Sequence, residues 1–174
     1  MRLNARIATG LLGLALAAPA AAAYAERVPE YELKAALLYN LTHFVEWPEG
    51  RNRSFNVCVV GEDPFGAVAG ALATKTVNGK PIAVRRAAVS PELKSCQILF
   101  VAASEADSLG PILEAVKGQP VLTVADADGP ARRGAVVTLA LEGPRIAFDI
   151  DATTARTAGL SISSKLLRLA RTVY

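Results

Sequence analysis

Residues 55–66 read FNVCVVGEDPFG, and this stretch decides the fold class. Its first half is a continuous apolar run, typical of a strand that is buried on both faces of a parallel sheet. The segment from Gly61 to Gly66 interrupts the run, and we predict a short alanine-rich helix over Phe65 to Ala73. A buried strand that leads directly into a helix is the first half of a βαβ unit, so the stretch predicts an α/β domain with a parallel sheet.

Strands and helices continue to alternate after this unit. We expect strands at 82–87 (IAVRRA), 97–103 (QILFVAA) and 120–126 (PVLTVAD), with one helical turn at 90–95 and a helix from Glu105 to Lys117. This order predicts helices packed on the sheet, because successive parallel strands need crossover connections.

The last third of the chain has a different pattern. Residues 135–151 (AVVTLALEGPRIAFDID) predict an antiparallel hairpin, since apolar and small or acidic residues alternate there. From Thr153 we predict a terminal helix, broken at Gly159. Its apolar face consists of Leu160, Ile162, Leu166, Leu169 and Val173. The expected fold is one three-layer α/β domain: a mostly parallel sheet flanked by helices, with a C-terminal antiparallel hairpin and a terminal helix.

The N-terminus has the pattern of a secretory signal peptide. Arg2 and Arg6 precede an apolar run from Ile7 to Ala18, and Ala23-Tyr24-Ala25 fits a cleavage site. We therefore predict a signal peptide at 1–25, a mature domain at 26–174 and a periplasmic location. An uncleaved anchor is the alternative, although the apolar run is shorter than the roughly 20 residues that span a bilayer.

Charge gives no indication of a nucleic-acid partner. The full chain has 19 Lys and Arg against 16 Asp and Glu, and without Arg2 and Arg6 the balance is 17 to 16. The sequence pI near 9.0 therefore depends on the predicted signal peptide and does not mark a nucleic-acid-binding protein.

Residues 33–50, LKAALLYNLTHFVEWPEG, predict a helix from Tyr31 to Trp47 that Pro48 ends. Apolar and aromatic residues lie on several sides of it, which leaves little solvent face. Two interpretations are open: the helix is buried within its own domain, or part of its surface meets a partner or a small ligand. Under the second interpretation the contact residues are Leu38, Tyr39, His43 and Trp47.

The chain has two cysteines, Cys58 and Cys96. Export makes a disulfide between them plausible, and neighbouring strands would bring the two sulfurs within bonding range. Two buried, reduced thiols are the alternative. A catalytic thiol pair is not indicated, because there is no Cys-x-x-Cys and no visible source of a low thiolate pKa.

No residue pattern indicates catalysis, a cofactor or a metal. His43 is the only histidine, which leaves no zinc cluster and no convincing Ser-His-Asp triad. The segment GEDPFG lacks the phosphate-binding motifs, so we interpret it as a helix-start turn in preference to an anion site. Asp126, Asp128, Asp149 and Asp151 are spaced acids that could bind a cation, but helix capping and solvation are the favoured interpretation.

Several blocks together resemble the YfiR-like family of periplasmic regulatory proteins. They are YELKAALLYNLTHFVEWP (31–48), FNVCVVGEDPFG (55–66), NGKPIAVRR (78–86), the strand after Cys96, VLTVADADG (121–129), RIAFDID (145–151) and AGLSISSKLLRLA (158–170). They occur in order over essentially the whole predicted mature chain. The sequence departs from the family pattern at Pro130, Ala135 and Asp151.

The resemblance implies regulation without catalysis. It implies an exported repressor that binds the periplasmic part of an inner-membrane diguanylate cyclase, lowers cyclic di-GMP output and biofilm formation, and is sequestered by an outer-membrane lipoprotein. Cys58 and Cys96 match the family's disulfide positions, whereas a later cysteine pair of some members is missing. A homodimer is a further option. The alternative function is a small-ligand sensor that acts on a membrane sensor kinase through a pocket near Gly61 to Gly66.

Overall fold

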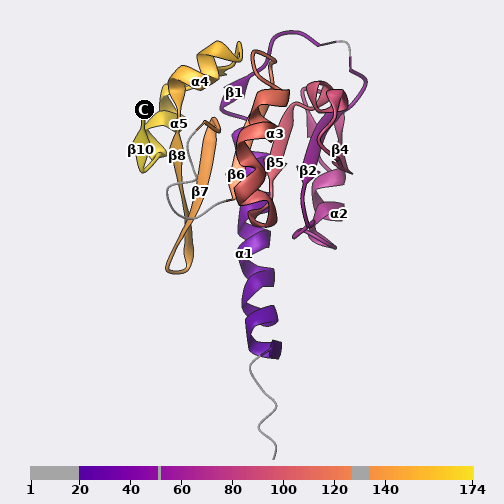
Figure 1. The fold of residues 1–174 in the computed structure, drawn as a ribbon, viewed down its shortest axis with the longest axis vertical. Coiled ribbons are helices and arrows are strands. Elements are labelled where there is room, and N and C mark those ends of the chain that lie inside the picture. The colour runs from indigo at the N-terminus through magenta and orange to yellow at the C-terminus, as the bar shows by residue number, and fades with distance from the viewer. Residues whose placement is uncertain (1–19, 51, 127–133) are drawn as a thin grey trace, which may run out of the picture.

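The computed structural model describes residues 20–50, 52–126 and 134–174, with side chains from residue 30 onward. Figure 1 shows one sheet with helices on both sides. The helices are α1 (Ala20–Leu41), α2 (Val68–Ala73), α3 (Leu109–Ala115), α4 (Ala152–Thr157) and α5 (Ser164–Leu169), with the 3-10 turns η1 (Pro91–Ser95) and η2 (Ala103–Ser108). The strands are β1 (Val45–Glu46), β2 (Phe55–Val60), β3 (Thr76–Val77), β4 (Lys80–Arg86), β5 (Ile98–Val101), β6 (Leu122–Asp126), β7 (Val137–Glu142), β8 (Arg145–Ile150), β9 (Ser161–Ile162) and β10 (Thr172–Val173).

The main sheet has eight strands in the order β10-β8-β7-β6-β5-β2-β4-β3. Strand β2 pairs in parallel with both β4 and β5, and the parallel arrangement continues through β6 to β7. Strands β7 and β8 form the antiparallel hairpin, and β3 pairs antiparallel with β4. The predicted α/β class and the mostly parallel sheet are therefore confirmed.

Alternate residues of the central strands enter two separate cores, which produces the three layers. Val57 and Val59 of β2 face the core under α1 and α2, while Cys58 and Val60 face the core under η1 and α3. Because both faces of β2 are covered by helices, all six of its residues are buried. A continuous apolar run of this kind is the pattern that the sequence shows at 55–60.

The first helix ends earlier than the sequence predicts. Helix α1 stops at Leu41, and the amides of Thr42, His43 and Phe44 donate to carbonyls three residues back. The Thr42 hydroxyl also donates to the Tyr39 carbonyl at 2.6 Å and so competes for a helical acceptor. The chain then forms β1, which pairs antiparallel with β9, so Trp47 lies beyond the helix.

The opposite end of α1 extends past the edge of the sheet (Figure 1). In the part of the chain that the structure describes, no helix is long and apolar enough to cross a bilayer. Residues 1–19 of the predicted signal peptide lie outside the described residues, so its extent stays a prediction.

The C-terminal segment also differs from the prediction. The predicted helix and its break at Gly159 are present as α4 and α5, but the segment also forms the short strands β9 and β10, which were not predicted. Strand β10 pairs in parallel with β8, so the hairpin is not the edge of the sheet. Leu169 and Val173 are exposed rather than buried, because the chain leaves the helix at Leu169 to reach its strand partner.

Arg171 holds this last segment on the sheet. Its guanidinium donates to both carboxylate oxygens of Asp149, at 2.9 and 2.5 Å, and to Glu142 at 2.6 Å. The hydrogen bond to Asp149, followed by that to Glu142, raises the pKa of Arg171 above its usual value. The two acids therefore fix β10 in register beside β8.

A disulfide joins Cys58 of β2 to Cys96, which directly follows η1. Their Cα atoms are 5.9 Å apart and both residues are buried. Because β2 and β5 are hydrogen-bonded neighbours, the bond links a central strand to the start of the next one.

Candidate functional site

The four predicted contact residues do not form one surface. Leu38 is 1% exposed and lies in the core under α1, so it packs against the sheet and is not available to a partner. This corrects its interpretation as a contact residue: Leu38 is one helical turn past Lys34 and three residues before Leu41, and all three are buried on the inner side of α1.

Tyr39 and His43 do lie together at the surface. Their rings meet edge to face with centroids 4.9 Å apart, and the His43 side chain is exposed while Tyr39 is half-buried. Tyr39 also lines a groove of about 560 Å³ between α1 and α2. The groove is lined by Glu32, Ala35, Ala36, Tyr39, Asn40, Ala67, Val68, Ala71, Leu72 and Lys75. Its floor is apolar and charged side chains stand at its rim, which is the composition of a protein-binding surface.

Trp47 lies elsewhere, at the amino ends of the central strands. Its indole N–H donates to the Gln97 carbonyl at 3.0 Å, and its ring packs edge to face on Phe55 at 5.0 Å. It borders a separate cavity of about 490 Å³ that also includes Pro48 and Asn78. Because its indole N–H and its ring both contact residues of the same domain, Trp47 stabilises the fold.

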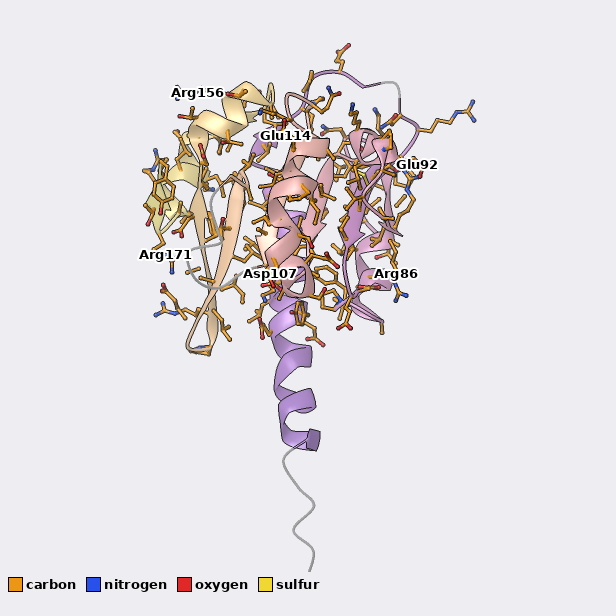
Figure 2. The ribbon with its side chains drawn as sticks, viewed as in Figure 1. Arg86, Glu92, Asp107, Glu114, Arg156 and Arg171 are labelled. Carbon is orange, nitrogen blue, oxygen red and sulfur yellow. A yellow bond between two sulfur atoms is a disulfide. The ribbon has the colours of Figure 1, made fainter. Side chains whose placement is uncertain are left out.

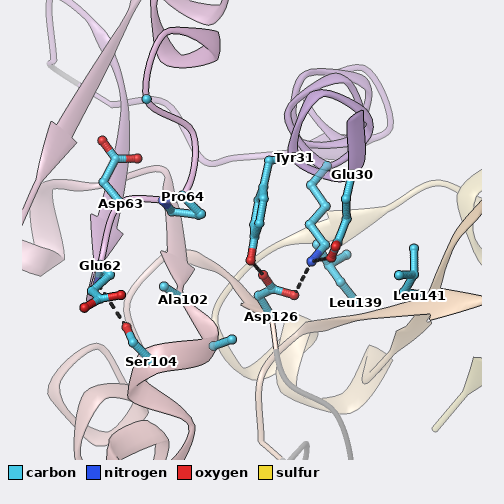
Figure 3. Close-up of a pocket in the computed structure, with 13 residues that line it drawn as sticks. Glu30, Tyr31, Glu62, Asp63, Pro64, Ala102, Ser104, Asp126, Leu139 and Leu141 are labelled. Atoms are coloured by element: carbon cyan, nitrogen blue, oxygen red, sulfur yellow. Dashed lines mark hydrogen bonds and ion pairs between the residues drawn. The ribbon is translucent and has the colours of Figure 1, made fainter. Parts of the chain in front are cut away.

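A polar cleft of about 620 Å³ lies at the carboxyl ends of β2, β5 and β6 (Figure 3). It is lined by Glu30, Tyr31, Lys34, Glu62, Asp63, Pro64, Gly66, Ala102, Ala103, Ser104, Asp126, Leu139 and Leu141. The chain leaves β2 toward β4 on one side and later returns to β5 on the other. Such a switch point, at the carboxyl ends of parallel strands, is where open α/β sheets bind ligands.

Lys34 is the charge at the inner end of this cleft. Its ammonium donates to Asp126 at 2.6 Å and to Glu30, and it lies 4.4 Å from the centre of the Tyr31 ring. The Tyr31 hydroxyl donates to the other Asp126 oxygen at 3.0 Å. Figure 3 shows the Tyr31 side chain directed at Asp126, with Glu30 beside them. A buried cation is thus balanced by two carboxylates that lie on different elements.

This cluster is not evident from the sequence pattern. Lys34 lies in an otherwise apolar helix, and the spacing of Asp126 from Asp128 favours a solvated or capping acid. The available signals were Glu30 and Lys34 at i and i+4, and a lysine within an otherwise apolar helix. Of the other spaced acids, Asp151 caps α4 by accepting from the Thr154 amide, Asp149 binds Arg171, and Asp128 lies outside the described residues.

The segment GEDPFG forms one wall of the cleft. Asp63 accepts from the Phe65 amide at 2.9 Å, as expected for a turn that starts a helix, and also pairs with Arg86. Helix α2 itself begins at Val68, three residues later than predicted. The Glu62 amide donates to the Ser104 hydroxyl at 2.9 Å, which ties this wall to the loop after β5.

Gly61 is the position where this wall admits no side chain. Its φ is +99°, and an added Cβ would lie 2.6 Å from Ser104 Oγ and 2.8 Å from Glu105 Cγ. We expect Gly61→Ala to lower the free energy of unfolding by about 1–3 kcal/mol, because strain and the close contact add. Urea unfolding followed by circular dichroism measures the change.

Gly70 supplies the matched control. It lies within α2, and an added Cβ would meet no atom within 4 Å. Gly70→Ala is expected to leave stability unchanged or raise it by up to about 1 kcal/mol. Equal losses in the two variants would contradict the close approach at Gly61.

No metal centre is evident in the described ranges: within them, no group of three or more His, Cys, Asp and Glu side chains could hold an ion. His43 stacks on Tyr39 at the surface rather than beside a hydroxyl nucleophile.

A family model described as YfiR/HmsC-like matches residues 31–171. Among solved structures, the chain is similar to a conserved domain protein from Vibrio cholerae O1 biovar El Tor strain N16961, with 14% identity and a TM-score of 0.53. It is also similar to the ABC domain from Streptococcus pneumoniae, solved in complex with L-Trp, with 11% identity and a TM-score of 0.51. Each match covers 83% of this chain but only 60% and 62% of the other chains, so the likeness concerns the fold of about three fifths of those proteins.

Proposed function

The chain belongs to the YfiR/HmsC-like family, and from this membership we propose that it is a periplasmic, non-enzymatic regulator that binds and represses an inner-membrane diguanylate cyclase. Its effect is to lower cyclic di-GMP signalling and biofilm formation. The observation that carries the proposal is the family match over residues 31–171, which includes nearly all of the described domain.

The disulfide supports the compartment. Bonds such as Cys58–Cys96 form and persist in oxidising environments, which include the periplasm. Together with the family match, the bond is consistent with an extracytoplasmic protein, and the predicted signal peptide at 1–25 gives the export route.

The surface proposed for the cyclase is the groove between α1 and α2 with Tyr39 and His43 beside it. Tyr39 offers a large apolar face with a polar tip, a feature common at binding hot spots. Lys75 and Glu32 at the rim supply charges of both signs. An outer-membrane lipoprotein that sequesters the regulator would compete for it, and a second copy of the chain is the remaining candidate for this groove.

Acidic side chains placed in the groove at Ala36 and beside it at His43 are expected to abolish repression without unfolding the protein. Ala36 and His43 are exposed, so Ala36→Glu/His43→Glu puts two acids on the surface and none in the core. We expect binding to weaken at least ~30-fold, as for loss of a hot spot, with a melting temperature within about 2–4 °C of the unchanged protein. Cellular cyclic di-GMP and thermal melts are the two measurements.

Ala88→Glu is the control, because Ala88 is also exposed but lies outside the groove. It is expected to repress normally. A photo-crosslinker at Tyr39 then identifies the occupant: an inner-membrane cyclase supports the proposal, whereas a sensor kinase or only self-adducts would reject the cyclase as partner of this surface.

A second candidate function rests on the polar cleft. A small-ligand sensor would hold a metabolite at the carboxyl ends of β2, β5 and β6 and act on a membrane sensor kinase. The favouring observation is the position of the cleft at the switch point of the sheet. Calorimetric titration with fractionated periplasmic extract separates the two candidates, since only the sensor yields a saturable signal from a small molecule.

A further inference from the structure

Charge is distributed unevenly along the domain. Residues 152–174 include Arg156, Lys165, Arg168 and Arg171 and no Asp or Glu, whereas residues 26–151 have 13 basic and 16 acidic side chains. The C-terminal segment is therefore positive on an otherwise acidic protein, and the structure places it at one edge of the sheet with α5 and β10 side by side (Figure 1).

Large apolar side chains are exposed in the same segment. Leu169 is 61% exposed, Val173 44% and Tyr174 70%, and these are three of the six large hydrophobic residues that are exposed in the described part of the chain. Lys165, Arg168 and Leu169 are at i, i+3 and i+4 of α5, so they share one side of that helix. We call Lys165, Arg168, Leu169 and Val173 the basic-apolar patch, because Val173 pairs with Ile150 on the face of the sheet that α5 covers. Tyr174 follows Val173 in the extended chain and so points to the opposite face.

The patch is held rigidly and its charges are available. The Ser163 side chain caps α5, Leu166 anchors the helix in the core, and Arg171 fixes the following strand through Asp149 and Glu142. Among the described residues, no ion pair includes Lys165 or Arg168. Among the basic residues at 152–174, the described ion pairs include Arg171, whereas the exposed Lys165 ammonium lies 5.4 Å from the centre of the Phe44 ring. Figure 2 shows Arg171 on the side of the molecule away from Glu92.

We propose that the basic-apolar patch binds the surface of a bilayer that contains anionic phospholipids. Two attractive contributions combine there: basic side chains attract acidic headgroups, and the exposed Leu169 and Val173 side chains enter the interfacial layer. The patch residues line none of the clefts described above, so the surface suits a broad lipid face more than an inserted peptide. The proposal is independent of which protein the regulator represses.

Sedimentation with vesicles tests this surface directly. The purified protein is mixed with vesicles of phosphatidylcholine alone, or with added phosphatidylglycerol, at low and high salt. We expect binding to the phosphatidylglycerol vesicles only, with a loss at high salt because screening weakens exposed charges. Arg168→Glu/Leu169→Ser is expected to lower the partition coefficient at least ~10-fold, since it reverses one charge and removes an apolar contact.

Lys94→Glu/Val89→Ser is the matched control, because both residues are exposed and lie on or next to η1, near Glu92 and away from the patch (Figure 2). This variant should bind like the unchanged protein. Absence of binding to phosphatidylglycerol vesicles, or equal losses in both variants, would overturn the proposal. A photo-crosslinker at Leu169 in native membranes must capture phospholipid; capture of an acidic protein alone would instead assign the patch to a protein partner.

Discussion

Replacing Cys58 and Cys96 together by alanine is expected to lower the free energy of unfolding by roughly 4 kcal/mol. The bond closes a loop with a sequence separation of 38 residues, and its loss returns that loop's freedom to the unfolded chain. Alanine is the appropriate replacement, because both positions are buried and a serine hydroxyl would lose its hydrogen bonds to water there. A loss of this size is a large part of the 5–15 kcal/mol that stabilises a typical domain.

Guanidinium unfolding under oxidising and reducing conditions measures this effect. The reduced, unchanged protein should unfold close to the double alanine variant, and a reductant should have no effect on that variant. If the oxidised protein and the variant differ by less than about 1 kcal/mol, the disulfide does not restrict the unfolded chain as the loop model requires.

The central part of the fold could be predicted because it depends on local patterns. Strand β2 is a continuous apolar run, and the hairpin of β7 and β8 alternates around a glycine-containing turn. The pattern of β2 follows directly from burial on both faces. In the hairpin the glycine-containing turn marks the reversal of the chain, but residues 137–140 and 148–150 are all buried, so burial itself does not alternate there. The proximity of Cys58 and Cys96 followed in turn from placing their strands side by side.

The short strands could not be predicted in the same way. Strands β1, β9 and β10 have two residues each, and they exist because a distant segment supplies hydrogen bonds. Helical periodicity therefore predicts helices that are too long near both ends of the chain. It predicts that the first helix reaches Trp47 and that Leu169 and Val173 lie on a buried helix face.

The sequence could not show which of the four predicted contact residues share a surface, for a related reason. Apolar and aromatic residues on several sides of one helix do not reveal which side faces the sheet. The sequence therefore groups Leu38 with Tyr39, although Leu38 is buried and Tyr39 reaches the surface. The pairing of Lys34 with Asp126 spans 92 positions of sequence, and only the packing of α1 over the end of β6 brings them together.

Asp126→Ala is expected to lower the free energy of unfolding by about 3 kcal/mol, because it removes one partner of a buried ion pair. Lys34 is only 3% exposed, so its ammonium cannot regain water without moving α1. Glu30 remains beside it, which places the expected loss at the lower end of the range for such pairs. Tyr31 also loses an acceptor for its hydroxyl. Chemical unfolding of the purified variant measures the loss.

Two further variants test whether the loss of stability in Asp126→Ala comes from leaving a buried charge unpaired or simply from removing a carboxylate. Glu114→Ala breaks the exposed pair with Lys117 and is expected to cost less than about 0.5 kcal/mol. Lys34→Met/Asp126→Leu removes the buried pair and should recover most of the stability, since an apolar pair of similar size needs no compensation and Glu30, whose side chain is 21% exposed, can be hydrated by solvent. If Asp126→Ala costs no more than Glu114→Ala, Asp126 does not hold the Lys34 ammonium. If the double variant is less stable than Asp126→Ala, the cleft depends on Lys34 itself, and the buried charge cannot be the cause of the loss.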